Sequence, residues 1–132
     1  EYGAIPIVNE NDTVVTDEIL FGDNDTLSAH IANMVHADLL IMLTDIDGLY
    51  EENPNDNPQA KLLSEISVIT DSIKKMAGGS SSNRGTGGMQ TKLEAACIAQ
   101  KSHTKTVIMS GDDPTKIYAL LEGEHIGTYF DC

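Results

Sequence analysis

The strongest chemical signal in this sequence is a glycine-rich segment, GTGGMQTK at residues 85–92, that runs into a helical pattern. Glycines let backbone N–H groups approach a phosphate closely, and a helix N-terminus adds a favourable dipole. Lys92 falls in the first helical turn, where that dipole disfavours a cation unless an anion offsets it. The Thr-Lys order differs from the Walker motif, in which Lys precedes Ser or Thr. The segment favours phosphate binding, with a flexible loop as the alternative.

Two polar clusters in the first part of the chain are candidates for binding a small ligand. The sequence NEND at 9–12 follows a short apolar run, and such a loop could hold the ammonium or carboxylate of an amino acid. The sequence GDND at 22–25 precedes a helical pattern. There a carboxylate could orient a lysine and an amide could hold a substrate. The alternatives are a plain turn for the first cluster and a helix N-cap for the second.

Other side chains that commonly bind metals lack the required spacing. The sequence TDIDG at 44–48 resembles part of a calcium loop, but with Gly48 at the sixth position Leu43 is first and Pro54 twelfth. Neither side chain offers a carboxylate, so we reject an EF-hand. The four histidines show no ligand spacing with cysteines. We therefore expect no metal site built from protein ligands alone.

These residues must be positioned by strands and helices that the apolar pattern predicts. Short apolar runs predict strands at 5–8, 39–43, 106–109 and 126–130, and a hairpin at 13–21. Helices are predicted from residue 24 or 25 onward, at 66–76, at 91–101 and after Asp113-Pro114. The expected inner faces are Leu27, Ile31, Met34 and Val35 in the first helix, and Ile117, Leu120 and Leu121 in the last.

Alternating strands and helices predict an α/β fold with a mainly parallel sheet. Ligands bind such sheets beyond the C-terminal ends of the strands. By this prediction the polar clusters at 9–12, 44–47 and 110–113 lie at that edge.

Composition restricts the classes of partner. The chain has 132 residues, which suits one domain, and a net charge of −13, which argues against a basic nucleic-acid-binding face. No apolar run approaches the roughly 20 residues that span a membrane. Two cysteines, Cys97 and Cys132, form no disulfide framework, so a reducing cytoplasm is expected. Residues 1–60 contain no Lys or Arg, so an anion site there must take its cations from elsewhere.

Taken together, these motifs resemble the glutamate 5-kinases of the amino acid kinase family. The matching stretches follow one another along nearly the whole chain: IPIVNEND (5–12), FGDNDTLSA (21–29), LLIMLTDIDGLY (39–50), NPQAKLL (57–63), GTGGMQTKLEAA (85–96) and GTYF (127–130). The resemblance implies a three-layer αβα sandwich, of which residues 1–132 are the C-terminal, nucleotide-binding part and the N-terminal half is missing. No second domain is expected, and the isolated chain is expected to be inactive.

The resemblance also implies a reaction, namely transfer of the ATP γ-phosphoryl group to the γ-carboxylate of L-glutamate with Mg²⁺, the first step of proline synthesis. Proline would be a feedback inhibitor, and the complete enzyme a homo-oligomer. The implied catalytic residues are Lys92 and Asp25, and the implied substrate-binding residues are Asn9, Asp12 and Asn24. The nucleotide would be bound by Thr44, Asp45, Thr86, Gly87, Gly88, Met89, Gln90, Thr91 and Lys92.

Several alternatives remain open from the sequence. They are another amino acid kinase such as an acetylglutamate or uridylate kinase, the kinase domain of a bifunctional pyrroline-5-carboxylate synthase, and a non-catalytic nucleotide-binding fragment. The NEND, GDND and GTGGMQTK motifs favour the glutamate 5-kinases over the first. Glutamate-dependent release of ADP would separate an enzyme from a binding fragment.

Overall fold

The computed structural model describes residues 3–10, 24–78 and 88–131. Within these ranges every helix is too short or too polar to cross a bilayer. The helices and strands are, in chain order, α1 (Asn24–Met34), β1 (Leu39–Thr44), β2 (Glu65–Ile66), α2 (Asp71–Gly78), α3 (Met89–Gln100), β3 (Lys105–Ser110), α4 (Lys116–Leu121) and β4 (Thr128–Phe130).

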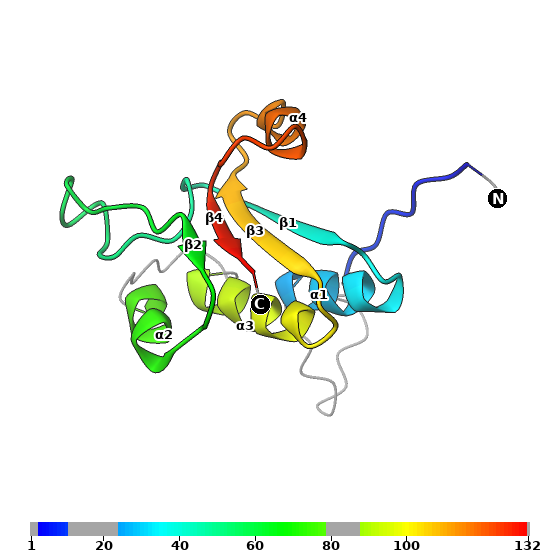
Figure 1. Cartoon of the computed structure of the whole chain (residues 1–132), viewed down its shortest axis with the longest axis horizontal. Coiled ribbons are helices and arrows are strands. Elements are labelled where there is room, and N and C mark those ends of the chain that lie inside the picture. The colour runs from blue at the N-terminus through cyan, green and yellow to red at the C-terminus, as the bar shows by residue number, and fades with distance from the viewer. Residues whose placement is uncertain (1–2, 11–23, 79–87, 132) are drawn as a thin grey trace.

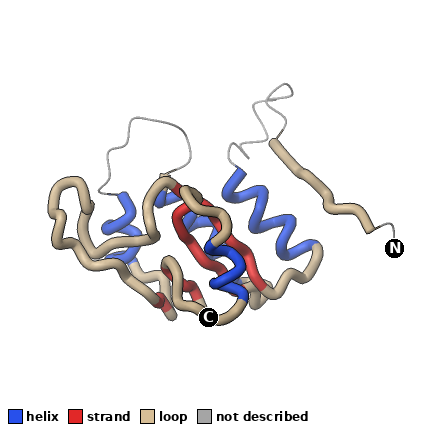
Figure 2. The backbone as a smooth tube through the Cα atoms, turned by 90° about the horizontal axis from the view of Figure 1, so that it is seen from above, coloured by secondary structure: helices blue, strands red, loops and turns tan. Residues whose placement is uncertain are grey.

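The strands form one sheet in the order β1-β3-β4-β2. β1 is parallel to β3 and β2 is parallel to β4, whereas β3 and β4 are antiparallel. Helices α1, α2 and α3 lie on one side of the sheet and α4 lies on the other (Figure 1). Seen from above, α4 lies across the strands (Figure 2). The predicted three-layer α/β fold with a mainly parallel sheet is confirmed, with one antiparallel pair.

Helix α3 is the centre of the larger core. Leu93, Ala95, Ala96 and Ala99 of this helix are buried and pack in one cluster with Met42, Ile108 and Phe130 of the sheet. On the opposite face, Leu120 of α4 packs on Val107 and Met109 of β3. The two faces of β3 are thus both covered, as expected for a central strand of an α/β sheet.

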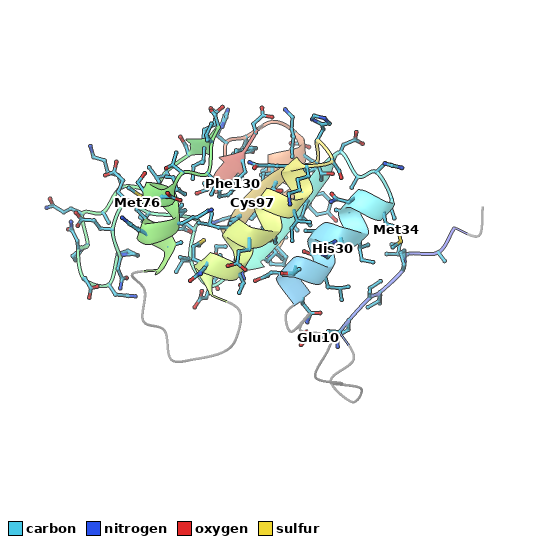
Figure 3. All side chains as sticks on the ribbon, turned by 90° about the horizontal axis from the view of Figure 1, so that it is seen from below. Glu10, His30, Met34, Met76, Cys97 and Phe130 are labelled. Carbon is cyan, nitrogen blue, oxygen red and sulfur yellow. The ribbon has the colours of Figure 1, made fainter. Side chains whose placement is uncertain are left out.

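The prediction for the inner face of α1 was wrong in part, because Leu27 and Ile31 are half-buried but Met34 and Val35 are exposed. The residues that are buried in α1 are Ala29 and Ala32. Alanines let two helices approach closely, and Ala29 packs in one cluster with the buried alanines of α3. Figure 3 shows α1 beside α3. At the C-terminal end of this helix, Met34 is 74% exposed, and Val35, which follows the helix, is 63% exposed. Periodicity alone could not show which stripe meets α3.

The predicted buried strand at 5–8 was also wrong. Residues 3–10 form no regular element, and Ile5 and Ile7 are 90% and 96% exposed. A strand needs a hydrogen-bonded neighbour, and this segment pairs with none of the described strands. The predicted hairpin at 13–21 lies outside the described residues.

Other predicted elements differ mainly at their ends. The helix predicted at 66–76 begins at Asp71, because Ile66 instead pairs with Phe130 as part of β2. The last helix begins at Lys116, after a turn in which the Asp113 carboxylate accepts a hydrogen bond from the Thr115 N–H at 3.1 Å. Leu121, predicted to face inward, is 65% exposed. The predicted elements at 39–43, 91–101 and 106–109 agree with β1, α3 and β3 within two residues.

Gly127 sets the approach of β4 to β3. Its φ is +82°, and a Cβ at this position would overlap the carbonyl oxygen of Ile108 on β3. Only glycine combines this backbone conformation with such a close approach. The register that places Thr128 opposite Ile108 follows directly after it.

Candidate functional site

The parallel pairing of β1 and β3 brings two predicted polar clusters to one edge of the sheet. Thr44 and Ser110 are partners in the register, and the Gly111 N–H donates a hydrogen bond to the Thr44 carbonyl at 2.8 Å. The Thr44 hydroxyl donates to the Asp45 carboxylate at 3.2 Å. The prediction that residues 44–47 and 110–113 follow neighbouring strands at the same edge is confirmed.

A pocket of about 240 Å³ opens beside this edge. It lies between the end of β1, the following loop, the last turn of α2 and the first turn of α3. The lining includes four residues predicted to bind nucleotide, Thr44, Asp45, Gly88 and Met89. Residues from two distant motifs therefore share one cavity.

The loop that forms one wall of the pocket is tied to β4. The Leu49 N–H donates to the buried hydroxyl of Thr128 at 2.9 Å. A Cβ at Gly48 would lie 2.6 Å from the same hydroxyl oxygen, so the close approach requires glycine. The loop thereby gains a fixed position relative to the sheet.

Tyr50 lies in the same wall, and its hydroxyl donates to the Asp47 carboxylate at 3.2 Å. Burial, followed by this hydrogen bond and the negative charge of Asp47, raises the pKa of Tyr50 above its usual value. The phenol is therefore neutral at neutral pH, and Tyr50 adds an aromatic side chain to the lining of the pocket.

An ion pair joins the first turns of α1 and α3. The Lys92 ammonium lies 3.2 and 3.1 Å from the two carboxylate oxygens of Asp25. The side chains of Lys92 and Asp25 are only 9% and 17% exposed. The two residues predicted to be catalytic are thus brought together, with the lysine held at a helix N-terminus by the carboxylate.

Next to this ion pair, Asn24 binds the N-terminal segment. Its amide donates to the Asn9 side-chain oxygen at 3.0 Å and accepts from the Glu10 N–H at 3.1 Å. Asn9 and Asn24 also line a cavity of about 480 Å³ whose other walls come from Pro6, Val8, α1 and β1. Two of the predicted substrate-binding residues therefore meet beside a cavity.

The remaining predicted site residues are placed differently. Asp12, Thr86 and Gly87 lie outside the described residues. Gln90 is exposed, and its amide donates to Glu94 at 3.4 Å on the surface of α3. Within residues 3–10, 24–78 and 88–131, no group of three His, Cys, Asp or Glu side chains could hold a metal ion.

Part of the pocket wall is formed by residues for which the sequence predicted no role. Tyr50, Met76 and Ala77 line the pocket, but no role was predicted for them. Tyr50 lies shortly after the polar cluster at 44–47, which begins at the end of β1. An aromatic residue at this place in the sequence could have indicated a role in the pocket. For Met76 and Ala77 there was no signal, because their place depends on how α2 packs against α3.

The chain is similar to proteins of a known family. Residues 1–110 match the amino acid kinase family. The chain is 52% identical over 134 residues to the glutamate 5-kinase of Listeria monocytogenes, covering 98% of this chain and 49% of that protein. It is 48% identical over 130 residues to the glutamate 5-kinase of Herpetosiphon aurantiacus, covering 98% and 35%. The chain thus spans about half or less of the length of these curated relatives.

Solved structures show a similar fold. Isopentenyl phosphate kinase of T. acidophilum, in a product complex, is 27% identical with a TM-score of 0.57, over 80% of this chain and 38% of that one. Uridylate kinase from Archaeoglobus fulgidus is 24% identical with a TM-score of 0.59, over 82% and 47%. The similarity covers most of the described elements.

Proposed function

Because this chain belongs to the amino acid kinase family, we propose that its full-length protein transfers the γ-phosphoryl group of ATP to the γ-carboxylate of L-glutamate. The product is γ-glutamyl phosphate. The observation that carries the proposal is the contact between α1 and α3, in which Asp25 of one predicted motif meets Thr91 and Lys92 of the other. The identity of 52% to a glutamate 5-kinase supports glutamate among possible acceptors.

The pocket beside β1 is the proposed nucleotide site. Thr44 and Asp45 form one wall, and Gly88 and Met89 bring the N-terminus of α3 to the other. Free N–H groups in the first turn of a helix, together with its dipole, favour a phosphate. Thr86, Gly87, Gln90 and the backbone of Thr91 complete the nucleotide segment in this proposal.

The second cavity is the proposed glutamate site. The Asn9 and Asn24 amides supply donors and acceptors that suit an ammonium and a carboxylate, and Asp12 belongs to the same motif. The γ-carboxylate is already ionised at pH 7, so the reaction needs no general base. The task of the site is to bring two anions together and to neutralise the charge that develops.

Lys92 is the proposed source of positive charge at the transferring group. It lies in the first turn of α3, near the Gly88 end of the pocket, and Asp25 holds its ammonium. Mg²⁺ is the proposed cofactor. Asp45, which lines the pocket, is the kind of ligand that binds Mg²⁺ together with phosphate oxygens and water. When bound, the ion neutralises phosphate charge.

The remaining features of the proposal concern the whole protein. Residues 1–132 would be the C-terminal, nucleotide-binding part of the kinase domain and inactive alone, since the chain covers 49% of the Listeria relative. Proline would inhibit the full-length enzyme, a homo-oligomer in the cytoplasm.

The proposal is tested by measuring ADP release from Mg-ATP by the full-length protein with and without glutamate. Release is expected to depend on glutamate. Lys92→Ala is expected to lower turnover roughly 100- to 1,000-fold, the loss typical of removing one charge-stabilising group. The matched control is Lys105→Ala, since Lys105 is 61% exposed and pairs with Asp131 away from both cavities. ADP release without glutamate, or near-normal turnover by Lys92→Ala, would contradict the proposal.

A further inference from the structure

The hydroxyl of Thr91 lies between two acceptors. It is 2.7 Å from the Asp25 Oδ2 atom and 2.7 Å from the carbonyl oxygen of Gly88. A hydroxyl has one proton, so a full hydrogen bond goes to one acceptor at a time. The Gly88 carbonyl also accepts the Lys92 N–H of α3 at 3.3 Å, whereas a carboxylate oxygen is the stronger, charged acceptor. The contact with Asp25 is therefore the favoured one.

This contact acts on the atom that holds the lysine. Asp25 Oδ2 accepts from the Thr91 hydroxyl and also lies 3.1 Å from the Lys92 ammonium. The carboxylate belongs to the first turn of α1, while Thr91 and Lys92 are consecutive residues of α3. With two partners on one neighbouring helix, the Asp25 side chain has little freedom to rotate. Its orientation in turn fixes the position of the ammonium.

Thr91 does not face the nucleotide pocket. Gly88 and Met89 line that cavity, but Thr91 is not among its lining residues. Its side chain is half-buried and is directed toward α1. The geometry therefore does not favour a contact between this hydroxyl and the nucleotide, although Thr91 belongs to the predicted nucleotide segment.

We propose that Thr91 is a positioning residue, whose hydroxyl fixes the Asp25 carboxylate and thereby places the Lys92 ammonium for phosphoryl transfer. The inference rests on the proposed function for its effect on turnover, but its structural part does not. If Asp25 loses one donor, it can rotate, and Lys92 loses its defined place. The hydroxyl thus contributes to catalysis without touching nucleotide or glutamate.

The structural part is tested by lysine acetylation of the full-length protein, measured by peptide mass spectrometry. Thr91→Val removes the hydroxyl and keeps the shape, and Thr91→Ser keeps the hydroxyl. Lys92 is 7% exposed and is expected to react slowly unless released. We expect Thr91→Val to raise its rate at least threefold relative to Lys105 in the same sample, about the release expected from losing one hydrogen bond, and Thr91→Ser to leave it low.

The catalytic part is tested by steady-state kinetics of the same variants. Thr91→Val is expected to lower kcat about tenfold or more, as for a lost hydrogen bond to a charged group, while the KM for ATP changes less than about threefold. Thr91→Ser is expected to restore most of kcat. A purely structural role would not lower kcat in Thr91→Val while leaving the KM for ATP nearly unchanged. A contact with the nucleotide would raise the KM for ATP instead.

The two measurements separate the inference from the proposed function. If Lys92 acetylation is the same in Thr91→Val as in the unchanged protein, or if the KM for ATP carries the loss, the positioning role is wrong. If the unchanged protein shows no glutamate-dependent turnover but Lys92 is released in Thr91→Val, the proposed reaction fails and the Thr91–Asp25–Lys92 contact stands.

Discussion

Asp25 and Lys92 are 67 residues apart in the sequence, yet their side chains form the ion pair on which the proposed site depends. The Asp25 carboxylate is stabilised at the N-terminus of α1, because the helix dipole favours a negative charge there. Lys92 is disfavoured at the corresponding place in α3, and Asp25 offsets this cost. At the scale of the residue, this ion pair therefore contributes more to stability than a pair between two exposed side chains would.

Replacing Asp25 by Asn is expected to destabilise the protein, because it leaves the largely buried Lys92 ammonium without its carboxylate. Breaking a fully buried pair costs roughly 3–5 kcal/mol, and the partial exposure of Asp25 reduces this to about 2 kcal/mol. The measurement is urea-induced unfolding of the full-length protein followed by circular dichroism.

The control is Asp131→Asn, which breaks the exposed pair between Asp131 and Lys105, whose side chains are 49% and 61% exposed. Exposed pairs contribute about 0.5 kcal/mol or less. Equal losses in the two variants would show that the Asp25–Lys92 pair is no more important to stability than a surface pair.

The sequence could predict the site better at some residues than at others. Motif and family resemblance together pointed to Asp25 as a partner for lysines and to Lys92 at the phosphates. The role of Thr91 was not visible, because a hydroxyl offers no sequence signal for which of several acceptors it meets. That choice depends on how closely α1 packs on α3.

At the scale of the elements, local patterns located the strands and helices but not always their neighbours. The apolar runs of β1 and β3 identified two strands correctly, since they are covered and paired within the described structure. The run at 5–8 is also apolar but has no partner among the described strands, and Ile5 and Ile7 are exposed. The predicted stripe of α1 failed in part, because the residues that are buried there, Ala29 and Ala32, carry little apolar signal.

Gly127→Ala is expected to destabilise the sheet at β4. The substitution adds a Cβ that overlaps the Ile108 carbonyl at a φ of +82°, so strain and overlap together should cost about 3 kcal/mol. Gly123→Ala is the matched control, because its φ is +100° but an added Cβ meets nothing within 4 Å. It should cost about 1 kcal/mol.

Thermal unfolding of both glycine variants measures the difference. If Gly123→Ala loses as much stability as Gly127→Ala, the backbone conformation alone explains the effect. The close approach of β4 to β3 would then not be the reason for glycine at position 127.

At the scale of the whole molecule, the distribution of charge constrains the reaction. The chain has a net charge of −13 and no Lys or Arg in residues 1–60. In the proposed reaction ATP and glutamate are both anions, and residues 1–60, which include Asn9 and Asn24, supply no Lys or Arg to neutralise them. Lys92 and Mg²⁺ would therefore act together with cations from elsewhere in the full-length protein. For this reason the reaction is proposed for the full-length protein. The chain covers 49% of the Listeria relative.

The most direct test of the account identifies the phosphorylated product. The full-length protein is incubated with Mg-ATP and each candidate acceptor in the presence of hydroxylamine, which attacks the carbonyl of an acyl phosphate and releases inorganic phosphate. We expect γ-glutamyl hydroxamate to form in equal amount to ADP with glutamate, and no hydroxamate to form with N-acetylglutamate or UMP. Formation of ADP without hydroxamate, or preferential phosphorylation of N-acetylglutamate or UMP, would contradict it.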